Sequence, residues 1–223
     1  MSKDLLLFLD SYVNNAKIIE VTELSSDELN KIPYIWLNLF KNKNDVLSST
    51  LLLWEKLSLN LQLVYEYLKA NLTSVDLVFY NNEYHLVFGL LSSSGKRVLY
   101  YHSHNPKNIQ LSPIYHYLPA DLKTFYQYFN GWNYLASESM GFLSINDIYS
   151  LDEYDWEILE SNSINIRLDE NFVVFENGDS GHICISNDGD LSKSLLWWLE
   201  EASILGIDFW PTIDTWIRLG FDD

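Results

Sequence analysis

The sequence is poor in cysteine, proline, glycine and basic residues. Its one cysteine, Cys184, excludes an intrachain disulfide and any metal site built from several cysteines, and it suits a reducing compartment. The 5 Pro and 9 Gly exclude collagen-like and low-complexity chains, and 48% hydrophobic residues predict a folded, soluble protein. With 14 Lys and Arg against 31 Asp and Glu, the net charge is -17. We therefore expect no nucleic-acid partner and no membrane partner, because both bind through basic residues.

Long apolar runs are also missing. The first apolar run, residues 5–9, ends at Asp10 and is shorter than the roughly 7 residues of a signal-peptide core. No run approaches the ~18 residues that a membrane-spanning helix needs. These observations predict a cytoplasmic protein.

The negative charge is concentrated in the second half of the chain. Residues 1–117 hold 10 basic and 11 acidic residues, for a net charge of -1, whereas residues 118–223 hold 4 and 20, for a net charge of -16. Six of the eight tryptophans also lie after residue 118. This change of composition predicts two domains, an N-terminal α+β region at 1–112 and a second domain at 113–223.

The first region is expected to hold helices followed by a small antiparallel sheet. Apolar residues recur at helical spacing over 46–69, and although the leucines at 57–63 also alternate as in a strand, we predict a helix. Three β-rich runs then predict a β-meander, at residues 75–80, 84–91 and 97–101. The segment 103–117 shows no period and is either a linker or a packed loop.

The second region begins with the clearest helix, which Leu118-Pro119 opens and Asn130-Gly131 closes. Pro suits the first turn of a helix, and Gly just past its end takes the left-handed conformation that stops it. A hairpin is expected at 172–186, around a turn rich in Asn and Gly.

Two helices are expected to finish the chain. The first starts near Ser192 and carries Leu195, Leu196 and Leu199. The second has Pro211 in its first turn and ends at Gly220.

Motifs of nucleophilic and nucleotide chemistry carry little weight here. Residues 178–181, Gly-Asp-Ser-Gly, copy the surroundings of a serine-protease nucleophile, but His182 follows where those enzymes have Gly, and a hairpin turn explains the segment. No glycine-rich phosphate loop occurs, and residues 187–190 lack the ligand spacing of a calcium loop. We predict no catalytic residue, cofactor or bound metal.

The histidines leave one alternative open. On an extended chain His102 and His104 point to the same side, ~7 Å apart, and could share a metal ion with a carboxylate or with His116. Surface histidines at the end of a strand are the commoner arrangement, and His85 is expected to be half-buried in a strand. A metal-dependent enzyme is therefore the least favoured function.

An acidic, aromatic segment is the strongest candidate for binding. Residues 147–160 contain six acids and no base, with Tyr149, Tyr154 and Trp156 interleaved. Such a field speeds the association of a basic protein, or it merely keeps the chain soluble, and charge alone does not decide between the two.

The segment 118–131 resembles the hallmark of the SUKH superfamily, in which a helix opened by Leu-Pro ends at Asn-Gly. The later order of a strand near Phe142, an acidic stretch, a hairpin and a terminal helix is similar too. The resemblance covers 113–223 and implies an α+β fold, with helices packed on a mostly antiparallel sheet. The family pattern is a short single domain, so residues 1–112 form either an extra domain or an extension of that sheet.

SUKH proteins include regulators of fungal cell-wall synthesis and bacterial immunity proteins that neutralise toxins, often nucleases. The resemblance and the charge together suggest a non-catalytic immunity protein that binds a basic, nuclease-type toxin. A regulatory scaffold of the same fold is the alternative. The residues expected to contact the partner are acids and two tryptophans: Trp132, Asp152, Glu153, Asp155, Trp156, Glu157, Glu160, Asp179, Asp188 and Asp190.

Overall fold

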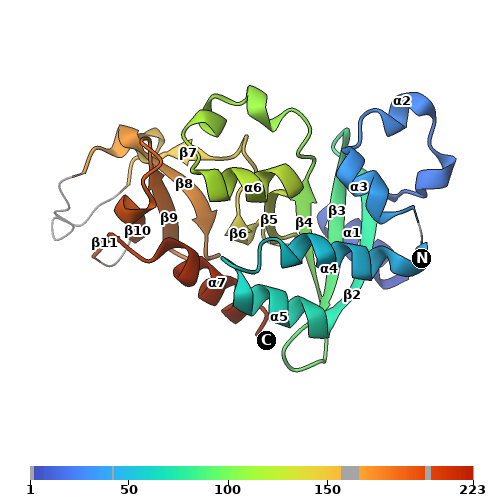
Figure 1. Ribbon diagram of the computed structural model, residues 1–223. Coiled ribbons are helices and arrows are strands. Elements are labelled where there is room, and N and C mark those ends of the chain that lie inside the picture. Colours follow the sequence, from blue (N-terminus) through green and yellow to red (C-terminus); the bar gives the residue numbers. More distant parts are fainter. Residues whose placement is uncertain (1–2, 42, 157–165, 199–201, 223) are drawn as a thin grey trace.

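One antiparallel sheet organises the protein (Figure 1). The computed structural model describes residues 3–41, 43–156, 166–198 and 202–222, and within them eleven strands pair in the order β1-β2-β3-β4-β5-β6-β8-β9-β10-β11, with β7 beside β8. The α+β class and the mostly antiparallel sheet expected from the sequence are confirmed. The strands are β1 (Lys17–Ile18), β2 (Leu72–Tyr80), β3 (Glu83–Leu91), β4 (Val98–His104), β5 (Asn130–Tyr134), β6 (Ser139–Phe142), β7 (Tyr149–Ser150), β8 (Asn171–Glu176), β9 (Gly181–Ser186), β10 (Leu195–Trp198) and β11 (Ile204–Leu205).

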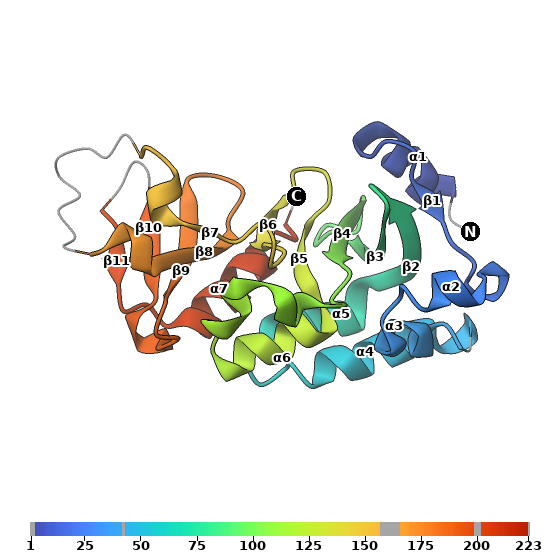
Figure 2. The same cartoon turned by 90° about the horizontal axis from the view of Figure 1, so that it is seen from above.

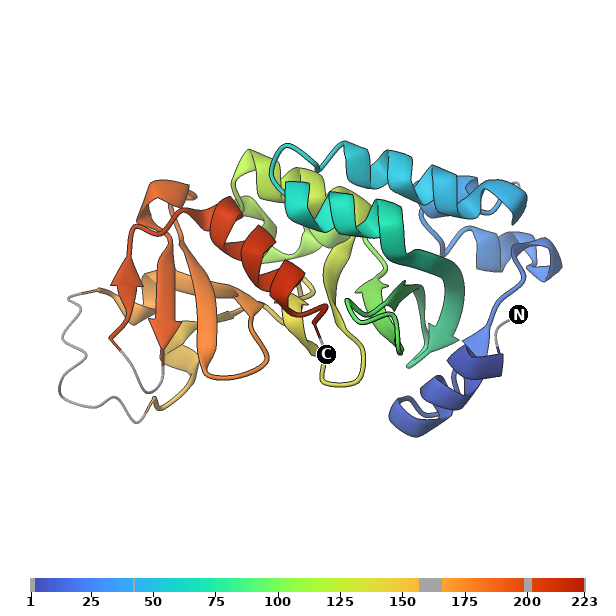
Figure 3. The ribbon, with the colours of Figure 1, turned by 90° about the horizontal axis from the view of Figure 1, so that it is seen from below.

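Helices cover the two faces of the sheet unequally. The α-helices are α1 (Lys3–Tyr12), α2 (Ser26–Leu29), α3 (Tyr34–Leu39), α4 (Val46–Glu55), α5 (Gln62–Asn71), α6 (Ala120–Tyr128) and α7 (Phe209–Leu219). Views from above and below place α4, α5, α6 and α7 on one side of the sheet and α1 on the other (Figure 2, Figure 3). No helix in the described ranges is long and apolar enough to cross a membrane.

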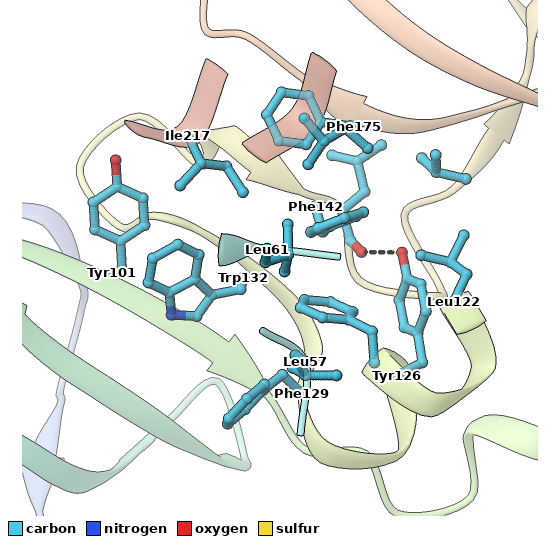
Figure 4. Close-up of a cluster of buried hydrophobic side chains, with 14 of the residues drawn as sticks. Leu57, Leu61, Tyr101, Leu122, Tyr126, Phe129, Trp132, Phe142, Phe175 and Ile217 are labelled. Carbon is cyan, nitrogen blue, oxygen red and sulfur yellow. Dashed lines mark hydrogen bonds between the residues drawn. The ribbon is translucent and has the colours of Figure 1, made fainter. Parts of the chain in front are cut away.

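The main core lies between the sheet and α4 to α7, and aromatic side chains from both halves of the chain fill it (Figure 4). Trp54 of α4 stacks on Phe129, with ring centroids 4.9 Å apart, and meets the edge of Trp132 at the same distance. Tyr126 donates a hydrogen bond to the Leu143 carbonyl at 2.8 Å. A smaller core on the other face packs Leu5 and Leu9 of α1 against the sheet.

The predicted β-meander is confirmed by β2, β3 and β4. Asn81 and Asn82 both have positive φ, at 50° and 63°, as a two-residue turn between twisted strands requires. The pairing of β4 with β5 then joins the meander to the strands that follow residue 113. Residues 1–112 and 113–223 therefore contribute to one sheet, whereas the domain boundary between them stays a prediction.

The predicted helix at 46–69 is two helices. Residues 56–61 separate α4 from α5, and Leu59 in this break is 93% exposed. The leucines at 57–63 therefore do not share one buried face, and their alternation reflects turns between helices and not a strand.

The sequence suggested that Asn130 and Gly131 stop the preceding helix, but they do not. Helix α6 ends at Tyr128, and both residues begin β5. The Asn130 side chain accepts a hydrogen bond from the Ile145 amide at 2.8 Å and donates one to the Asn105 carbonyl at 3.3 Å. Gly131 has a φ of 74°, and a Cβ there would lie 2.6 Å from the Ser144 amide nitrogen. The pair thus joins β5 to neighbouring loops.

The first of the two expected terminal helices is a strand. Residues 191–193 form only a 3₁₀ turn, after which β10 pairs with β9, so that Leu195 lies opposite Cys184. A Leu-Leu-Trp-Trp run fits a pleated, largely buried surface, and the tertiary pairing outweighs the helical preference of leucine. Leu199 lies outside the described residues. The hairpin of β8 and β9 and the final helix α7 are confirmed.

Candidate functional site: an acidic hollow

A polar hollow of about 580 Å³ opens on the sheet face opposite to α4–α7. His102 and Asn133 line it, whereas their strand neighbours Tyr101 and Trp132 belong to the helix-covered core. Residues from β4, β5, β7 and β8, from the loops between β5 and β8, and from the β2–β3 turn form its walls. The full lining is Asn81, His102, His104, Asn133, Glu138, Leu143, Asn146, Asp147, Ile148, Tyr149, Glu153, Tyr154 and Glu176.

Four carboxylates face this acidic hollow, and local hydrogen bonds hold three of them. Asp147 accepts from the Ser144 hydroxyl. Glu153 accepts from the Ser150 amide at 3.0 Å as part of a capping box. Glu176 accepts from the Tyr149 hydroxyl at 2.9 Å. The fourth, Glu138, lies in the turn between β5 and β6 with a φ of 53° and is exposed.

In the described part of the chain, no Lys or Arg side chain neutralises these carboxylates, although His182 Nδ1 lies 3.7 Å from Glu176. The lining of the acidic hollow contains neither Lys nor Arg. Within the described ranges, none of the four acids forms an ion pair with Lys or Arg, whereas acids elsewhere do, such as Asp169 with Arg167. An uncompensated acidic concavity of this kind attracts cationic groups, because low-dielectric walls concentrate the field.

Glu176 is the most buried of the four acids. Burial raises the pKa of its carboxyl, but hydrogen bonds from His182 and Tyr149 outweigh that effect and set the pKa below its usual range. Burial, followed by the Glu176 charge, raises the pKa of the Tyr149 hydroxyl well above its usual range. Glu176 is therefore ionised and Tyr149 remains a donor at neutral pH.

Three histidines meet at the β4 side of the acidic hollow. His85 and His102 are 1% and 3% exposed, and the His104 side chain is 27% exposed. Burial first, and then repulsion from His104, lowers the pKa of His85 to about 2 and that of His102 to about 3. Both rings are thus neutral at pH 7. The sequence pattern placed His102 and His104 on one face, and the structure adds His85.

The structure brings some of the predicted partner-binding residues together. Glu153 lines the acidic hollow, and Asp152 and Asp155 are exposed beside it in the sequence. Trp156 is half-buried, with its ring edge-on to His182 and Trp197. Glu157 and Glu160 lie outside the described residues.

Trp132 cannot be a partner anchor, and this expectation is corrected. Its side chain is 0% exposed and stacks on Tyr101 with centroids 4.4 Å apart (Figure 4). The alternation of side chains along β5 directs Trp132 into the core and Asn133 into the acidic hollow. Trp132 is therefore a residue of the hydrophobic core.

The remaining predicted acids do not join the acidic hollow. Asp179 lies in the turn between β8 and β9, where it lines a different pocket with Arg97. Asp188 and Asp190 follow the opposite end of β9, about 20 Å away for a strand of this length. Lys193 lies within ion-pair distance of both, so their charge is partly neutralised.

The Gly-Asp-Ser-Gly segment is part of a turn. The Asn177 side-chain oxygen accepts from the amides of Asp179 and Gly181, at 2.9 and 3.0 Å. These bonds are those of an Asx turn, in which the side chain of Asn organises the backbone that follows it. The turn explanation of residues 178–181 fits these bonds.

Three of the four acids of the acidic hollow are not among the predicted contacts: Glu138, Asp147 and Glu176. Asp147 stood at the start of the acidic run, and the position of Glu176 opposite His182 follows from the hairpin register. Glu138 carries no signal in the sequence, because only the pairing of β5 with β6 brings it here.

One comparison with known proteins gives a match. The family model described as SMI1 / KNR4 family (SUKH-1) matches residues 116–219, from the end of the 3₁₀ turn at 113–116 to the last residue of α7. No curated protein and no solved structure matches the sequence. The matched segment contains α6 and the strands that form most of the acidic hollow. The resemblance noted in the sequence is confirmed, and residues 116–219 are a domain of the SUKH-1 (SMI1/KNR4) family.

Proposed function

We propose that this protein is a cytoplasmic immunity protein that binds and neutralises a basic, nuclease-type bacterial toxin. The observation that carries the proposal is the set of four carboxylates around the acidic hollow, none of which forms an ion pair with Lys or Arg in the described ranges. The SUKH superfamily includes immunity proteins, and the acidic hollow lies mainly within the family domain.

The charges fit such a partner. Enzymes that cleave nucleic acid bind phosphate through Lys and Arg. A protein that covers such a surface offers carboxylates to those side chains and excludes the nucleic acid by like charge. Hydrogen bonds already orient Asp147, Glu153 and Glu176, so little conformational entropy is lost when a cation binds.

Aromatic residues beside the carboxylates supply apolar contact area. Tyr154 is 57% exposed, and its ring packs edge-on against Tyr149 at 4.8 Å. A Lys or Arg side chain that enters the acidic hollow would lie against these rings, where cation–π attraction adds to the ion pair. Tyr154 therefore replaces Trp132 as the proposed aromatic anchor.

Neutralisation here requires binding and no catalysis, because a blocked surface stops the toxin. A non-catalytic regulatory scaffold of the same fold would use the same acidic hollow for a cellular partner. The two differ in their biology: only an immunity protein restores the growth of cells that express its partner.

Affinity capture from the native source tests the proposal. The tagged protein is exposed to lysate, eluted in steps of rising salt, and the eluate is identified by mass spectrometry. A basic partner released by moderate salt is expected, since charge pairing weakens as salt screens it. The captured partner is then expressed with and without this protein. Restored growth supports immunity, and a harmless partner supports the scaffold.

Charge reversal locates the binding surface. Glu138→Lys should lower affinity for the captured partner at least tenfold at low salt, with a smaller effect at high salt. Glu55→Lys changes the net charge equally, but Glu55 is exposed on α4, on the opposite side of the sheet. The affinity of this variant for the captured partner should stay within about twofold of that of the parent protein. Equal losses in both variants, or no loss in Glu138→Lys, would remove the acidic hollow from the interface.

A further inference from the structure

Two neighbouring strands present four metal-ligating side chains on one face of the sheet. Side chains two residues apart in a strand point the same way, so Glu83 and His85 share a face of β3, and His102 and His104 share a face of β4. The pairing of Leu86 with Ser103 sets the register that brings these residues side by side. This arrangement requires no long-range loop and depends only on the β3–β4 hairpin.

The side-chain atoms that bind metals converge at this point. One ring nitrogen from each of His85, His102 and His104 lies within 4.8 Å of the others. The Glu83 carboxylate is 3.3 Å from His104 Nδ1 and 3.8 Å from His85 Nε2. Three imidazoles and one carboxylate are therefore gathered around one point.

Nitrogens in this cluster have no hydrogen-bond partner in the described ranges. Both ring nitrogens of His85 and Nε2 of His102 are buried and unpaired. A buried polar atom without a hydrogen-bond partner costs free energy, and folded proteins keep few such atoms. A cation that accepts the nitrogen lone pairs satisfies atoms that the protein itself leaves unsatisfied.

Neighbouring groups already orient the rings as metal ligands require. The Tyr80 hydroxyl is 2.6 Å from His102 Nδ1, which leaves Nε2 for another partner. Tyr80 also stacks on His85, with centroids 3.7 Å apart and planes 10° from parallel. Histidines that bind metals commonly use the second nitrogen for such an orienting bond.

We propose that His85, His102 and His104, with Glu83 as the fourth ligand, form a binding site for a divalent zinc-class metal ion. Imidazole suits zinc, copper and nickel and is a poor ligand for magnesium or calcium, and three imidazoles with a carboxylate match the tetrahedral preference of Zn²⁺. Zn–N bonds of about 2.1 Å place two nitrogens about 3.4 Å apart. The three ring nitrogens now lie within 4.8 Å of one another, so they need to draw together only slightly when the metal binds.

The site shares His102 and His104 with the acidic hollow, and it is tested with the metal alone, in the absence of any protein partner. Full-length protein without a histidine tag is stripped with a chelator, and Zn²⁺ is titrated by calorimetry. Co²⁺ serves as a spectroscopic probe, since a tetrahedral site gives strong visible absorption. We expect one equivalent of Zn²⁺ with a sub-micromolar Kd, tetrahedral Co²⁺ bands and a higher Tm with metal.

Two variants of partly exposed ligands localise the site without disturbing the core. His104→Ala and Glu83→Gln should each weaken Zn²⁺ binding at least tenfold, with unchanged circular dichroism. His116→Ala removes an exposed histidine outside the cluster and should bind as the parent does. The proposal is overturned if the parent protein takes up no Zn²⁺, if His104→Ala binds it as tightly as the parent, or if His116→Ala loses it equally.

Discussion

Asp214 of α7 caps helix α5 from 150 residues away. Its two carboxylate oxygens accept hydrogen bonds from the amides of Leu63 and Val64, each at 2.9 Å. These amides belong to the first turn of α5, whose own N-cap residue, Leu61, has no side chain that could accept them. The C-terminal helix α7 thus supplies the N-terminal cap of α5, a helix of the N-terminal region.

Loss of this cap should destabilise the whole protein. Asp214→Ala leaves two amide donors without a partner, that of Val64 at a buried position, so the free energy of unfolding should fall by about 1–3 kcal/mol. Thr215→Ala changes the next, exposed residue of the same helix and should have little effect. Urea unfolding followed by circular dichroism measures both. Equal stability of Asp214→Ala and the parent would mean that water caps α5 as well.

Gly131 should tolerate alanine poorly for two separable reasons. It has a φ of 74°, and a Cβ would contact the Ser144 amide nitrogen at 2.6 Å. Gly95 has a similar φ of 69°, yet a Cβ there would meet nothing within 4 Å. Gly95→Ala should therefore cost about 1 kcal/mol from backbone strain alone, and Gly131→Ala clearly more. Thermal unfolding of the two variants isolates the steric part; similar losses would contradict it.

Elements with local signals could be predicted from the sequence, whereas those decided by distant pairing could not. The Asn81-Asn82 turn and the hairpin of β8 and β9 carry their own turn chemistry, and the structure confirms both. The leucines of β10 predict a helix, and only the pairing of this segment with β9 makes it a strand. The sequence predicts a helix stop at Gly131, because the close approach of Ser144 to this glycine is not a local feature.

The candidate site shows the same division. The acidic run at 147–160 was recognised from composition, and Glu153 within it does line the acidic hollow. Glu138 and Glu176 reach that hollow through strand pairing. Residue type alone does not tell which face of a strand a side chain occupies, so the sequence suggests a surface anchor at Trp132 where the structure buries it.

Glu176 should make stability depend on pH in the acid range. Its pKa is lowered in the folded state, where hydrogen bonds from His182 and Tyr149 outweigh burial. The unfolded chain then binds the proton more readily, so the contribution of Glu176 to stability is full above the unfolded pKa of about 4.3 and is lost as pH falls through the folded pKa. Glu176→Gln should flatten stability against pH below about pH 5.

Urea unfolding at a series of pH values checks this expectation. Glu23→Gln, which neutralises an exposed acid in the 3₁₀ turn at 21–23, controls for the loss of one negative charge. If both variants change the pH dependence of stability at acid pH equally, the effect comes from net charge and not from the hydrogen bonds of Glu176.

The unpaired carboxylates of the acidic hollow should limit stability. Glu138→Gln removes one of four neighbouring negative charges with almost no change in shape, and the charge of the whole chain is -17. Stability at low salt should rise slightly, by up to about 0.5 kcal/mol, because repulsion is relieved. The gain should vanish in 1 M salt, where the Debye length is only ~3 Å and the repulsion is screened. Thermal melts at both salt concentrations test this, and a loss of stability at low salt would contradict it.

The domain predicted at 113–223 should not fold without residues 1–112. Removing them takes β4 from β5 and so exposes a new edge in the middle of the sheet. It also removes Trp54, which packs on Phe129 and Trp132, and the amides that satisfy Asp214. The fragment should therefore aggregate or melt without a cooperative transition, as judged by circular dichroism and size-exclusion chromatography. Cooperative unfolding with a Tm near that of the full chain would instead identify residues 113–223 as an independent domain, and the eleven-stranded sheet as two units joined at the β4–β5 pairing.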